Sequence, residues 1–386
     1  MGTLAERGAL IIGDGYRTKR DELAGSGFRI LRVADVLDGR VEAGGPDFVA
    51  ESFRPQIGAK AAQDGDVLVT TKGTVGRVAM MPALAEEVVY SPQLCFFRVT
   101  DRDVVDPRFL SYWFASEAFR EQASHRANNT DMAAYINLAD IRSLEVDLPA
   151  VRTQRAIAEV LGALDDKIAA NAALISRADD LAEQKFLAMT MNDNTSRPLS
   201  SLAQFVNGKA FTKGATGTGR VVIRIAELNS GLGNSTVYHD LDVSEKYLAR
   251  PGDLLFAWSG SLTVQRWFHD EGIINQHIFK VIPTDVPKWV VNGSLRAKLA
   301  EFKGIAADKA TTMGHIQRHH LDEAVLVPND EAIASSTSAM QSLWDRALQA
   351  ERESLKLAEL RDTLLPELVS GRFRVKNAEQ QIKEGV

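Results

Sequence analysis

Apolar residues recur at the spacing of a helix face in the stretch that follows Pro149. The intervals between them are four, three and four residues, and the same rhythm continues to residue 175. A stripe of this kind lies along one side of an α-helix and packs against a second helix. We therefore expect a long helix that begins after Pro149 and ends near Met191, before the polar segment NDNTSRP (192–198). The predicted stripe consists of Ile157, Leu161, Leu164, Ile168 and Ile175, with Asn171 at one of its positions.

The same pattern returns around residue 340 and predicts a second long helix. Asn329 or Asp330 is a suitable N-cap for it, and Pro366 is expected to end or kink it before Gly371. Each helix contains about 40 residues, which corresponds to a length of ~60 Å. The second stripe consists of Met340, Leu343, Ala347, Ala350, Leu357, Leu364 and Leu368.

Neither helix can bury its stripe alone, so we predict that the two pack on each other as an antiparallel pair. In that pair Asn171 either lies on the seam, where it sets the register or meets a polar partner, or marks the point where the stripe reaches the surface. The expected seam places Ile157, Leu161, Leu164, Ile168 and Ile175 against Met340, Leu343, Leu357 and Leu364.

The rest of the chain contains an internal repeat with a period of about 190 residues. Each copy joins short apolar strands, broken by Gly, Pro and Asp, to helical segments, as in a mixed α/β domain. A period this long exceeds a solenoid unit and indicates a domain followed by a long helix, present twice. The matching segments are 29–39 with 221–231, 65–76 with 252–263, 91–99 with 274–282, and 136–149 with 316–328.

We therefore predict an α+β fold in which two long antiparallel, coiled-coil-like helices separate two mixed α/β domains related by the repeat. The expected boundaries are 1–148 for the first domain, 149–195 for the central helix, 196–328 for the second domain and 329–386 for the final helix. Within the first domain, Asp106 and Pro107 are expected to open a helix. Its aromatic residues recur at helical spacing, so we expect them to belong to the core rather than to a base-stacking platform.

Composition places few further limits. The net charge of −6 argues weakly against a free-standing nucleic-acid binder, so local clusters must supply any affinity for DNA. A single cysteine, Cys95, excludes a disulfide framework and lies in the run LCFFRV, as expected of a buried strand thiol. We find neither a targeting segment nor an apolar run long enough to span a membrane, and therefore expect a cytoplasmic location.

Motifs of catalysis are missing from the chain. Gly208 and Lys209 lack the earlier glycine of a P-loop, and no Asn-Pro-Pro-aromatic tetrapeptide of amino-methyltransferases occurs. His315 and His319 have a spacing that suits a metal, but no second ligand pair accompanies them. We therefore expect a protein without catalytic residues, metal or cofactor.

The overall layout resembles the specificity (S) subunit of type I restriction–modification systems, over almost the whole chain. Gln154 matches the pattern of that family, whereas Thr153 stands where an acidic residue is usual. The segments that carry the resemblance are LPAVRTQRAIAEVLGALDDKIAAN (148–171), GDVLVTTKGTVG (65–76), GDLLFAWSG (252–260), INQHIFKV (274–281) and LRDTLLPELVSGRFRV (360–375).

The resemblance implies a non-catalytic recognition subunit. Each α/β domain would be a target-recognition domain that reads one half of a bipartite, asymmetric site on double-stranded DNA. The helices would set the distance between the half-sites, roughly one turn of DNA or ~34 Å. They would also bind two methyltransferase (M) subunits, and through them the restriction (R) subunits. The residues predicted to form the partner interface are Asp165, Asp166 and Asn171, the first two as an exposed acidic pair.

Loops that follow equivalent strands in the two copies carry the candidate DNA contacts. Segments 15–20 and 208–214 place cations beside glycine, and such side chains neutralise phosphates or pair with guanine. Segments 70–77 and 258–266 offer small hydroxyls, glycines and Gln265, whose amide suits adenine. Solvated charged loops and tight turns are the alternative interpretations. The predicted contacts are Arg17, Lys19, Arg20, Thr71, Lys72, Arg77, Lys209, Lys213, Ser259, Ser261, Gln265 and Arg266, and the weaker ones are Arg126, Asn128, Asn129 and Lys309.

A different class of protein also fits these patterns. A scaffold could use the helix pair to recruit partners while its globular halves bind protein or small ligands rather than DNA. Binding to random-sequence duplex, with and without a methyltransferase partner, would distinguish the two.

Overall fold

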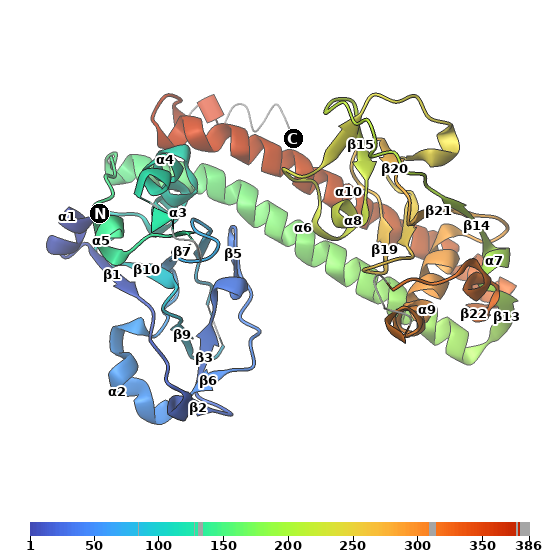
Figure 1. Ribbon diagram of the computed structural model, residues 1–386, viewed down its shortest axis with the longest axis horizontal. Coiled ribbons are helices and arrows are strands. Elements are labelled where there is room, and N and C mark those ends of the chain that lie inside the picture. The colour runs from blue at the N-terminus through green and yellow to red at the C-terminus, as the bar shows by residue number, and fades with distance from the viewer. Residues whose placement is uncertain (84, 127, 130–133, 309–313, 376, 379–386) are drawn as a thin grey trace. The chain divides into compact units, whose positions relative to one another are not determined.

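The computed structural model describes the whole chain except residues 84, 127, 130–133, 309–313, 376 and 379–386. The chain divides into two compact units (Figure 1). Unit 1 contains Met1–Asp166 and Leu357–Val386, and unit 2 contains Lys167–Lys356. The division cuts both long helices, so each unit holds one α/β domain together with a part of each helix.

Unit 1 is built on two four-stranded sheets and a layer of short helices. The first sheet is antiparallel, and the second joins β3 and β9 in parallel, with Ile30 beside Val89. The first sheet has the order β1 (Leu10–Asp14), β10 (Leu94–Val99), β7 (Val67–Thr70), β8 (Val78–Met80). The second has the order β2 (Leu23–Ala24), β6 (Phe48–Val49), β3 (Phe28–Leu31), β9 (Val88–Tyr90). The short strands β4 (Val36–Leu37) and β5 (Arg40–Val41) pair, as do β11 (Asn128–Asn129) and β12 (Ala134–Tyr135).

The short helices of unit 1 are divided between its two sheets: Ile57 of the second helix lies in the core formed by β3, β6 and β9, and the other helices lie by the first sheet. The short helices are α1 (Gly2–Glu6), α2 (Arg54–Ile57), α3 (Pro107–Ala115), α4 (Glu117–Arg126) and α5 (Leu138–Arg142). The carboxylate of Asp106 accepts a hydrogen bond from the Phe109 backbone N–H at 2.9 Å, which caps α3 as the sequence predicts. The aromatic residues of α3 are buried; Phe114 lies 4.4 Å from Phe97 between ring centroids. The core interpretation of this segment is therefore confirmed.

Unit 2 repeats this plan with different lengths. Its first sheet has the order β14 (Ala203–Asn207), β21 (Ile278–Pro283), β18 (Leu254–Ala257), β19 (Thr263–Arg266). Its second has the order β16 (Val237–His239), β15 (Arg220–Ile223), β20 (Gly272–Ile274), β17 (Leu248–Ala249), and β15 and β20 are again parallel. A further pair joins β13 (Asn194–Pro198) to β22 (Ala324–Pro328). The helices are α7 (Leu199–Leu202), α8 (Ile225–Ser230) and α9 (Lys288–Asp308). The 3₁₀ turn η5 (Glu245–Tyr247) lies between β16 and β17, and η6 (Arg318–Asp322) lies between α9 and β22. The predicted α+β class with two related α/β halves is thus confirmed.

The long helices α6 (Val151–Asn192) and α10 (Asp330–Val369) lie antiparallel within unit 2. At one end of that contact Asn171 donates to a carboxylate oxygen of Glu353 at 2.8 Å, and at the other Asn329 donates to Asp193. Asn171 is 3% exposed, so it lies on the seam and meets a polar partner rather than reaching the surface. Met340 is buried in unit 2, whereas Ile168, Ile175 and Leu343 are half-buried there.

Unit 1 contains the other ends of the two helices. Ile157, Leu161 and Leu164 of α6 are buried, as are Leu357 and Leu364 of α10. The start of α10 lies in unit 2, where Asn329, one of the two predicted N-caps, accepts a hydrogen bond from the Ala332 N–H. Of the two outcomes predicted for Pro366, an end or a kink of the helix, the first is wrong, since α10 continues through Pro366 to Val369. The lost N–H costs one hydrogen bond, and Gly371, with φ of 74°, follows the end of the helix.

Candidate nucleic-acid interface

The predicted contact loops of each unit meet at one end of its first sheet, which we call the shared edge. In unit 1 it comprises Asp14–Arg20, Thr71–Lys72, Gln93 and Tyr135; in unit 2 it comprises Asn207–Lys213, Trp258–Ser259, His277 and His315. Three backbone hydrogen bonds define it in both units. In unit 1 the Gly15 N–H donates to the Leu94 carbonyl oxygen at 3.1 Å, and the Thr71 N–H donates to that of Gln93 at 2.9 Å. The Ile136 N–H donates to the Thr71 carbonyl oxygen at 2.9 Å. In unit 2 the Gly208 N–H donates to the Ile278 carbonyl oxygen at 3.0 Å, and the Trp258 N–H donates to that of His277 at 3.1 Å. The Ile316 N–H donates to the Trp258 carbonyl oxygen at 3.1 Å.

A glycine brings the first loop close to the neighbouring chain in each unit. A Cβ on Gly15 would lie 2.0 Å from the carbonyl oxygen of Ser91, and a Cβ on Gly208 would lie 2.1 Å from that of Asn275. No side chain fits at such distances, so each position requires glycine. The internal repeat therefore extends to the local geometry of the candidate site.

The cations of the unit 1 edge are available to a ligand. Arg17 and Lys19 are exposed in the loop after β1, Arg20 is exposed at the start of the 3₁₀ turn Arg20–Glu22, and Lys72 is exposed after β7. Thr71 is partly used inside the protein, because its hydroxyl donates to the Gln93 carbonyl oxygen at 2.9 Å. Arg77 and Arg126 are half-buried, with Arg126 bonded to Ser143 at 3.1 Å. Asn128 and Asn129 form β11, and Lys309 lies outside the described residues.

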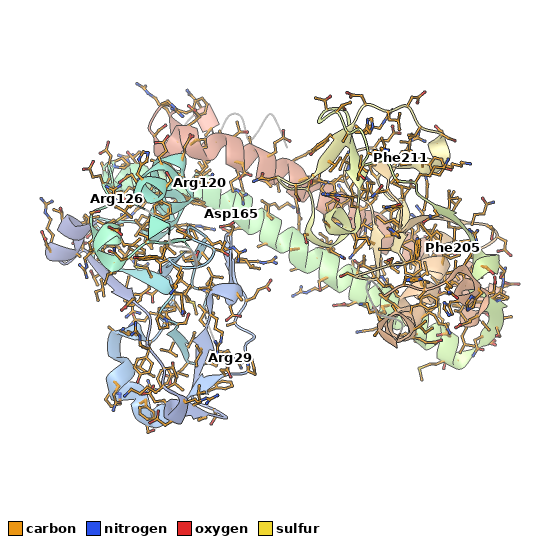
Figure 2. All side chains as sticks on the ribbon, viewed as in Figure 1. Arg29, Arg120, Arg126, Asp165, Phe205 and Phe211 are labelled. Atoms are coloured by element: carbon orange, nitrogen blue, oxygen red, sulfur yellow. The ribbon has the colours of Figure 1, made fainter. Side chains whose placement is uncertain are left out.

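The unit 2 edge combines lysines with aromatic rings. Lys209 and Lys213 are exposed, and Phe211, labelled in Figure 2, lies 5.6 Å from Tyr247 between ring centroids. The ammonium groups of Lys209 and Lys246 lie 5.1 and 5.2 Å from the Tyr247 ring centroid, within the range of a cation–π interaction. Lys246 and Tyr247 belong to η5 and were not among the predicted contacts.

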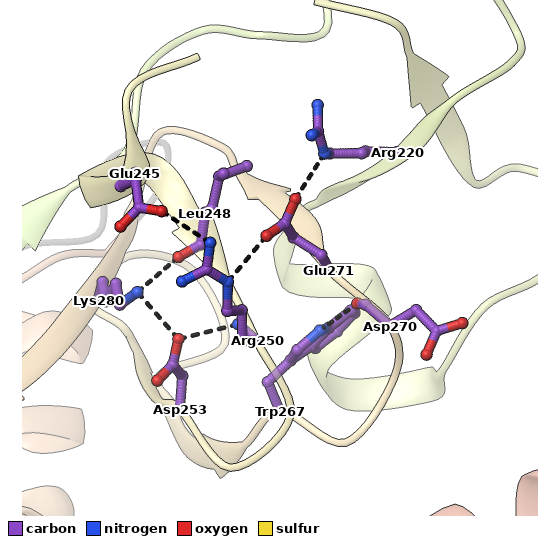
Figure 3. Close-up of polar contacts among 9 residues, drawn as sticks. All are labelled: Arg220, Glu245, Leu248, Arg250, Asp253, Trp267, Asp270, Glu271 and Lys280. Carbon is purple, nitrogen blue, oxygen red and sulfur yellow. Dashed lines mark hydrogen bonds and ion pairs between the residues drawn. The ribbon is translucent and has the colours of Figure 1, made fainter. Parts of the chain in front are cut away.

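A polar network holds η5 and the adjoining β17 in place (Figure 3). Arg250 donates to Glu245 at 2.8 Å and to Glu271 at 2.9 Å, and Arg220 donates to the other oxygen of Glu271 at 2.7 Å. Hydrogen bonds from Arg250, followed by those from Arg220, lower the pKa of Glu271 below its ordinary value. Lys280 donates to the Leu248 carbonyl oxygen at 2.6 Å and so joins this network to the first sheet.

The other predicted contacts of unit 2, two serines and a glutamine, differ in how far they are exposed to solvent. Ser261 is exposed, whereas Ser259 is buried and forms a β-bridge with His315. The Gln265 amide is half-buried and donates to the Thr263 hydroxyl at 3.1 Å. Of these three, Ser261 is the residue with the most surface open to a ligand.

Arg266 does not lie at the shared edge. It ends β19 opposite Leu254, whereas the edge adjoins the other end of that strand, where Thr263 pairs with Ala257. Arg266 is 6% exposed and donates to Glu351 at 2.8 Å through two nitrogen atoms, with Asp179 at 3.3 Å. Burial raises the pKa of Glu351, and the bonds from Arg266 oppose this shift. The linear match of Arg266 to Arg77 is thus not a structural equivalence.

The residues predicted to bind partners are engaged inside the chain. Asp165, labelled in Figure 2, accepts hydrogen bonds from the Tyr112 hydroxyl at 2.5 Å and from Arg361 at 2.9 Å. Asp165 is half-buried and therefore differs from the exposed carboxylate that we expected. Asp166 is exposed and pairs with Arg108. Asn171 is buried on the seam, so of the three only Asp166 presents most of its side chain to solvent.

The sequence led us to expect neither a metal site nor a membrane-spanning segment, and the structure bears on both points. Across the described residues, no group of three or more His, Cys, Asp or Glu side chains is placed to hold a metal ion. His319 lies in η6 with its ring 4.1 Å from that of His320, while His315 precedes η6 at the shared edge. None of the helices in the described part of the chain is both long and apolar enough to cross a membrane.

Comparison with known proteins identifies a related family. Residues 11–178 match the family described as Type I restriction modification DNA specificity domain. No curated protein matches the chain significantly. The crystal structure of a Type-I restriction-modification system S subunit from M. genitalium matches with a TM-score of 0.57 and 15% identity, over 93% of each chain. The HsdS subunit from Thermoanaerobacter tengcongensis matches with a TM-score of 0.34 and 13% identity, over 95% of this chain and 97% of that one.

These matches confirm the family resemblance inferred from the sequence. Residues 11–178, which include most of the unit 1 domain and about two thirds of α6, match the type I restriction modification DNA specificity domain. The match to the M. genitalium structure shows that the fold is shared over nearly the whole chain, including both units.

Proposed function

We propose that this chain is the DNA specificity subunit of a type I restriction–modification system. In this proposal each shared edge reads one half of a bipartite target on double-stranded DNA in the cytoplasm. The observation that carries the proposal is the repeated edge, which has the same backbone hydrogen bonds and the same close glycine in both units. Since the side chains on the two edges differ, the two half-sites differ and the target is asymmetric.

The exposed cations supply the affinity for the DNA backbone. Arg17, Lys19 and Arg20 in unit 1 and Lys209 and Lys213 in unit 2 are exposed beside the repeated glycines. Such cations neutralise phosphates and fix the position of a protein on the duplex, while other side chains read the bases. The net charge of −6 indicates that the isolated chain binds DNA weakly.

The long helices supply the partner surface. In this proposal α6 and α10 bind two methyltransferase subunits, which in turn bind the restriction subunits. The chain performs no catalytic step and needs no cofactor, because the transferred methyl group and the nuclease belong to its partners. Asp166 is the predicted interface residue that remains most exposed for such a contact.

An exchange of the second domain tests the proposal. The full chain is co-expressed with its methyltransferase subunits, and methylated positions are mapped by sequencing. We expect a bipartite site, and replacement of residues 196–328 by the second domain of another family member should change one half-site only. Methylation that does not depend on the chain, or an exchange that alters both half-sites, would contradict the proposal. Binding of a protein or small ligand, with no sequence-dependent methylation, would favour the scaffold alternative.

A further inference from the structure

Unit 2 carries a cluster of three aromatic side chains on its shared edge. The ring centroid of Trp258 lies 5.1 Å from that of His277 and 6.2 Å from that of His315. The Trp258 indole N–H donates to the Asn207 carboxamide oxygen at 2.8 Å, which fixes the plane of the indole. All three rings are half-buried, so each presents part of its surface to solvent.

The backbone of His277 is strained. Its φ of 73° lies in the left-handed region, and across the described residues no other residue except glycine has a positive φ. Such a conformation costs roughly 1 kcal/mol or more for a residue with a Cβ. The Nδ1 atom of His277 is also buried without a hydrogen-bond partner among the described residues. Glycine would adopt this backbone conformation at lower cost, which makes the His277 imidazole a candidate for a role in binding.

The corresponding positions of unit 1 carry unlike side chains. The shared backbone hydrogen bonds align Trp258 with Thr71 and His277 with Gln93, and the β-bridges align His315 with Tyr135. One unit therefore presents Trp, His and His where the other presents Thr, Gln and Tyr, at positions that share the same backbone hydrogen bonds. The backbone angles differ at one of these positions, because Gln93 does not have the positive φ of His277. Side chains that differ in size, aromaticity and hydrogen-bonding groups contact different bases, so this difference is expected of two domains that recognise different DNA sequences.

The surroundings of the cluster favour DNA as its ligand. The Phe211 N–H donates to the Asn275 side chain at 3.0 Å, and the Gln276 N–H donates to the Lys209 carbonyl oxygen at 2.8 Å. The lysine loop and the turn that carries His277 are thus joined directly. Lys209 and Lys213 of the lysine loop are exposed, and exposed cations of this kind contact phosphates.

We propose that Trp258, His277 and His315 contact the bases of the half-site read by unit 2, and that Thr71, Gln93 and Tyr135 do so in unit 1. This inference rests on the proposed DNA-recognition function. Imidazole N–H groups donate to the O6 and N7 acceptors of guanine, and the ring faces contact the methyl group of thymine. In unit 1 the Gln93 amide matches the N6 and N7 groups of adenine. The two edges therefore select different bases.

The first experiment transfers the unit 1 side chains to unit 2. The variant W258T/H277Q/H315Y is co-expressed in the full chain with the methyltransferase subunits, and the methylated sites are mapped. We expect about a tenfold loss of discrimination at one or more positions of one half-site, with the other half-site unchanged. His239→Gln, a half-exposed histidine on β16 away from the edge, is the matched control and should leave both half-sites unchanged.

A second variant separates recognition from folding. His277→Gly relieves the positive φ, so its thermal unfolding temperature should equal or exceed that of the wild type. Its base preference in one half-site should nevertheless relax. Full wild-type preference in the folded His277→Gly protein, or an unchanged half-site in the folded triple variant, would overturn the inference while leaving the proposed function intact. If the wild-type complex itself methylates no bipartite site, the proposed function fails and this inference fails with it.

Discussion

The two units support the same edge in different ways. In unit 1, Asp66 is 1% exposed and accepts hydrogen bonds from Arg98 at 2.8 and 2.7 Å and from the Tyr90 hydroxyl at 2.7 Å. Burial raises the pKa of Tyr90, which keeps its hydroxyl protonated as a donor. In unit 2 the corresponding carboxylate is Asp253, whose side chain is 27% exposed and pairs with Lys280 at 2.9 Å.

The difference shows which part of the edge is constrained. Ile274 and Ile282 occupy the positions in unit 2 that Tyr90 and Arg98 occupy in unit 1, so both donors to the carboxylate have been replaced by apolar residues. The carboxylate itself is kept as Asp253 and pairs with Lys280 from another position of β21. The backbone hydrogen bonds and the close glycine are the same in both units. The side chains that support the edge therefore differ between the two units, as do those on the edge, while the strand register and the backbone hydrogen bonds are the same.

Breaking the buried pair of unit 1 should have the largest effect. Arg98→Met leaves Asp66 buried without its cation, and we expect a loss of about 3–5 kcal/mol in the free energy of unfolding. Lys280→Met, at the more exposed pair of unit 2, should cost only about 1 kcal/mol. Chemical denaturation measures both losses, and hydrogen exchange should localise the larger one to unit 1. The double variant D66L/R98M should recover most of the stability; equal losses for Arg98→Met and Lys280→Met would refute the comparison.

Changing the close glycines tests what the units share. A Cβ at residue 15 or 208 would overlap a neighbouring carbonyl group, so Gly15→Ala and Gly208→Ala should each cost about 1–3 kcal/mol. Each should also weaken recognition of one half-site, measured by mapping methylated sites. Gly25→Ala and Gly233→Ala are matched controls, because a Cβ at either position meets nothing within 4 Å. If only one of the two variants lost stability and recognition, the close glycine would not have the same role in both units.

The smallest effect concerns the contacts between α6 and α10, which use Asp165 and Arg361 in unit 1 but Asn171 and Glu353 in unit 2. The hydrogen bond from Asn171, followed by the Lys167 contacts, lowers the pKa of Glu353 in the folded state. Ionised Glu353 therefore stabilises the fold above the unfolded-state pKa, and this contribution disappears as the pH falls through the folded-state pKa. Asn171→Leu should change stability by less than about 1 kcal/mol at pH 7.

The pH dependence provides the check on that variant. The stability of Asn171→Leu should depend less on pH below about 5 than that of the wild type. Arg177→Leu, an exposed position of α6, provides the control and should keep the wild-type dependence. An identical acid profile for Asn171→Leu and the wild type would show that the Asn171–Glu353 contact does not affect the titration of Glu353.

Periodicity and repetition predicted the elements of the fold but not all of the side-chain partners. The long helices, the strands of the repeat and the buried aromatic residues of α3 depend on local patterns that a single sequence displays. Arg266 was misplaced because strand register puts it at the far end of β19, beside carboxylates of two distant helices. Asp165 looked exposed because its partners, Tyr112 and Arg361, are separated from it by 53 and 196 residues.

The aromatic cluster of unit 2 illustrates a second limit. Trp258 and His277 both lie in segments of the repeat that the sequence identified, but the reason for singling out His277 is its backbone angle. A positive φ at a histidine leaves no recognisable trace in composition or spacing. One signal was available in the sequence, the mismatch of Thr71 with Trp258 in the paired segments 65–76 and 252–263. The pairing of 91–99 with 274–282 places Gln93 opposite Gln276, whereas the backbone hydrogen bonds of the structure align Gln93 with His277, one residue further on.

The division of the two long helices has a consequence for synthesis of the protein. Unit 2 is a single stretch, Lys167–Lys356, whereas unit 1 joins Met1–Asp166 to Leu357–Val386. Leu357, Leu364 and Leu368 are buried, and Arg361 bonds to Asp165, so unit 1 needs these late residues. On the ribosome, the domain that is translated first is therefore completed last, after unit 2 has all the residues that it needs to fold.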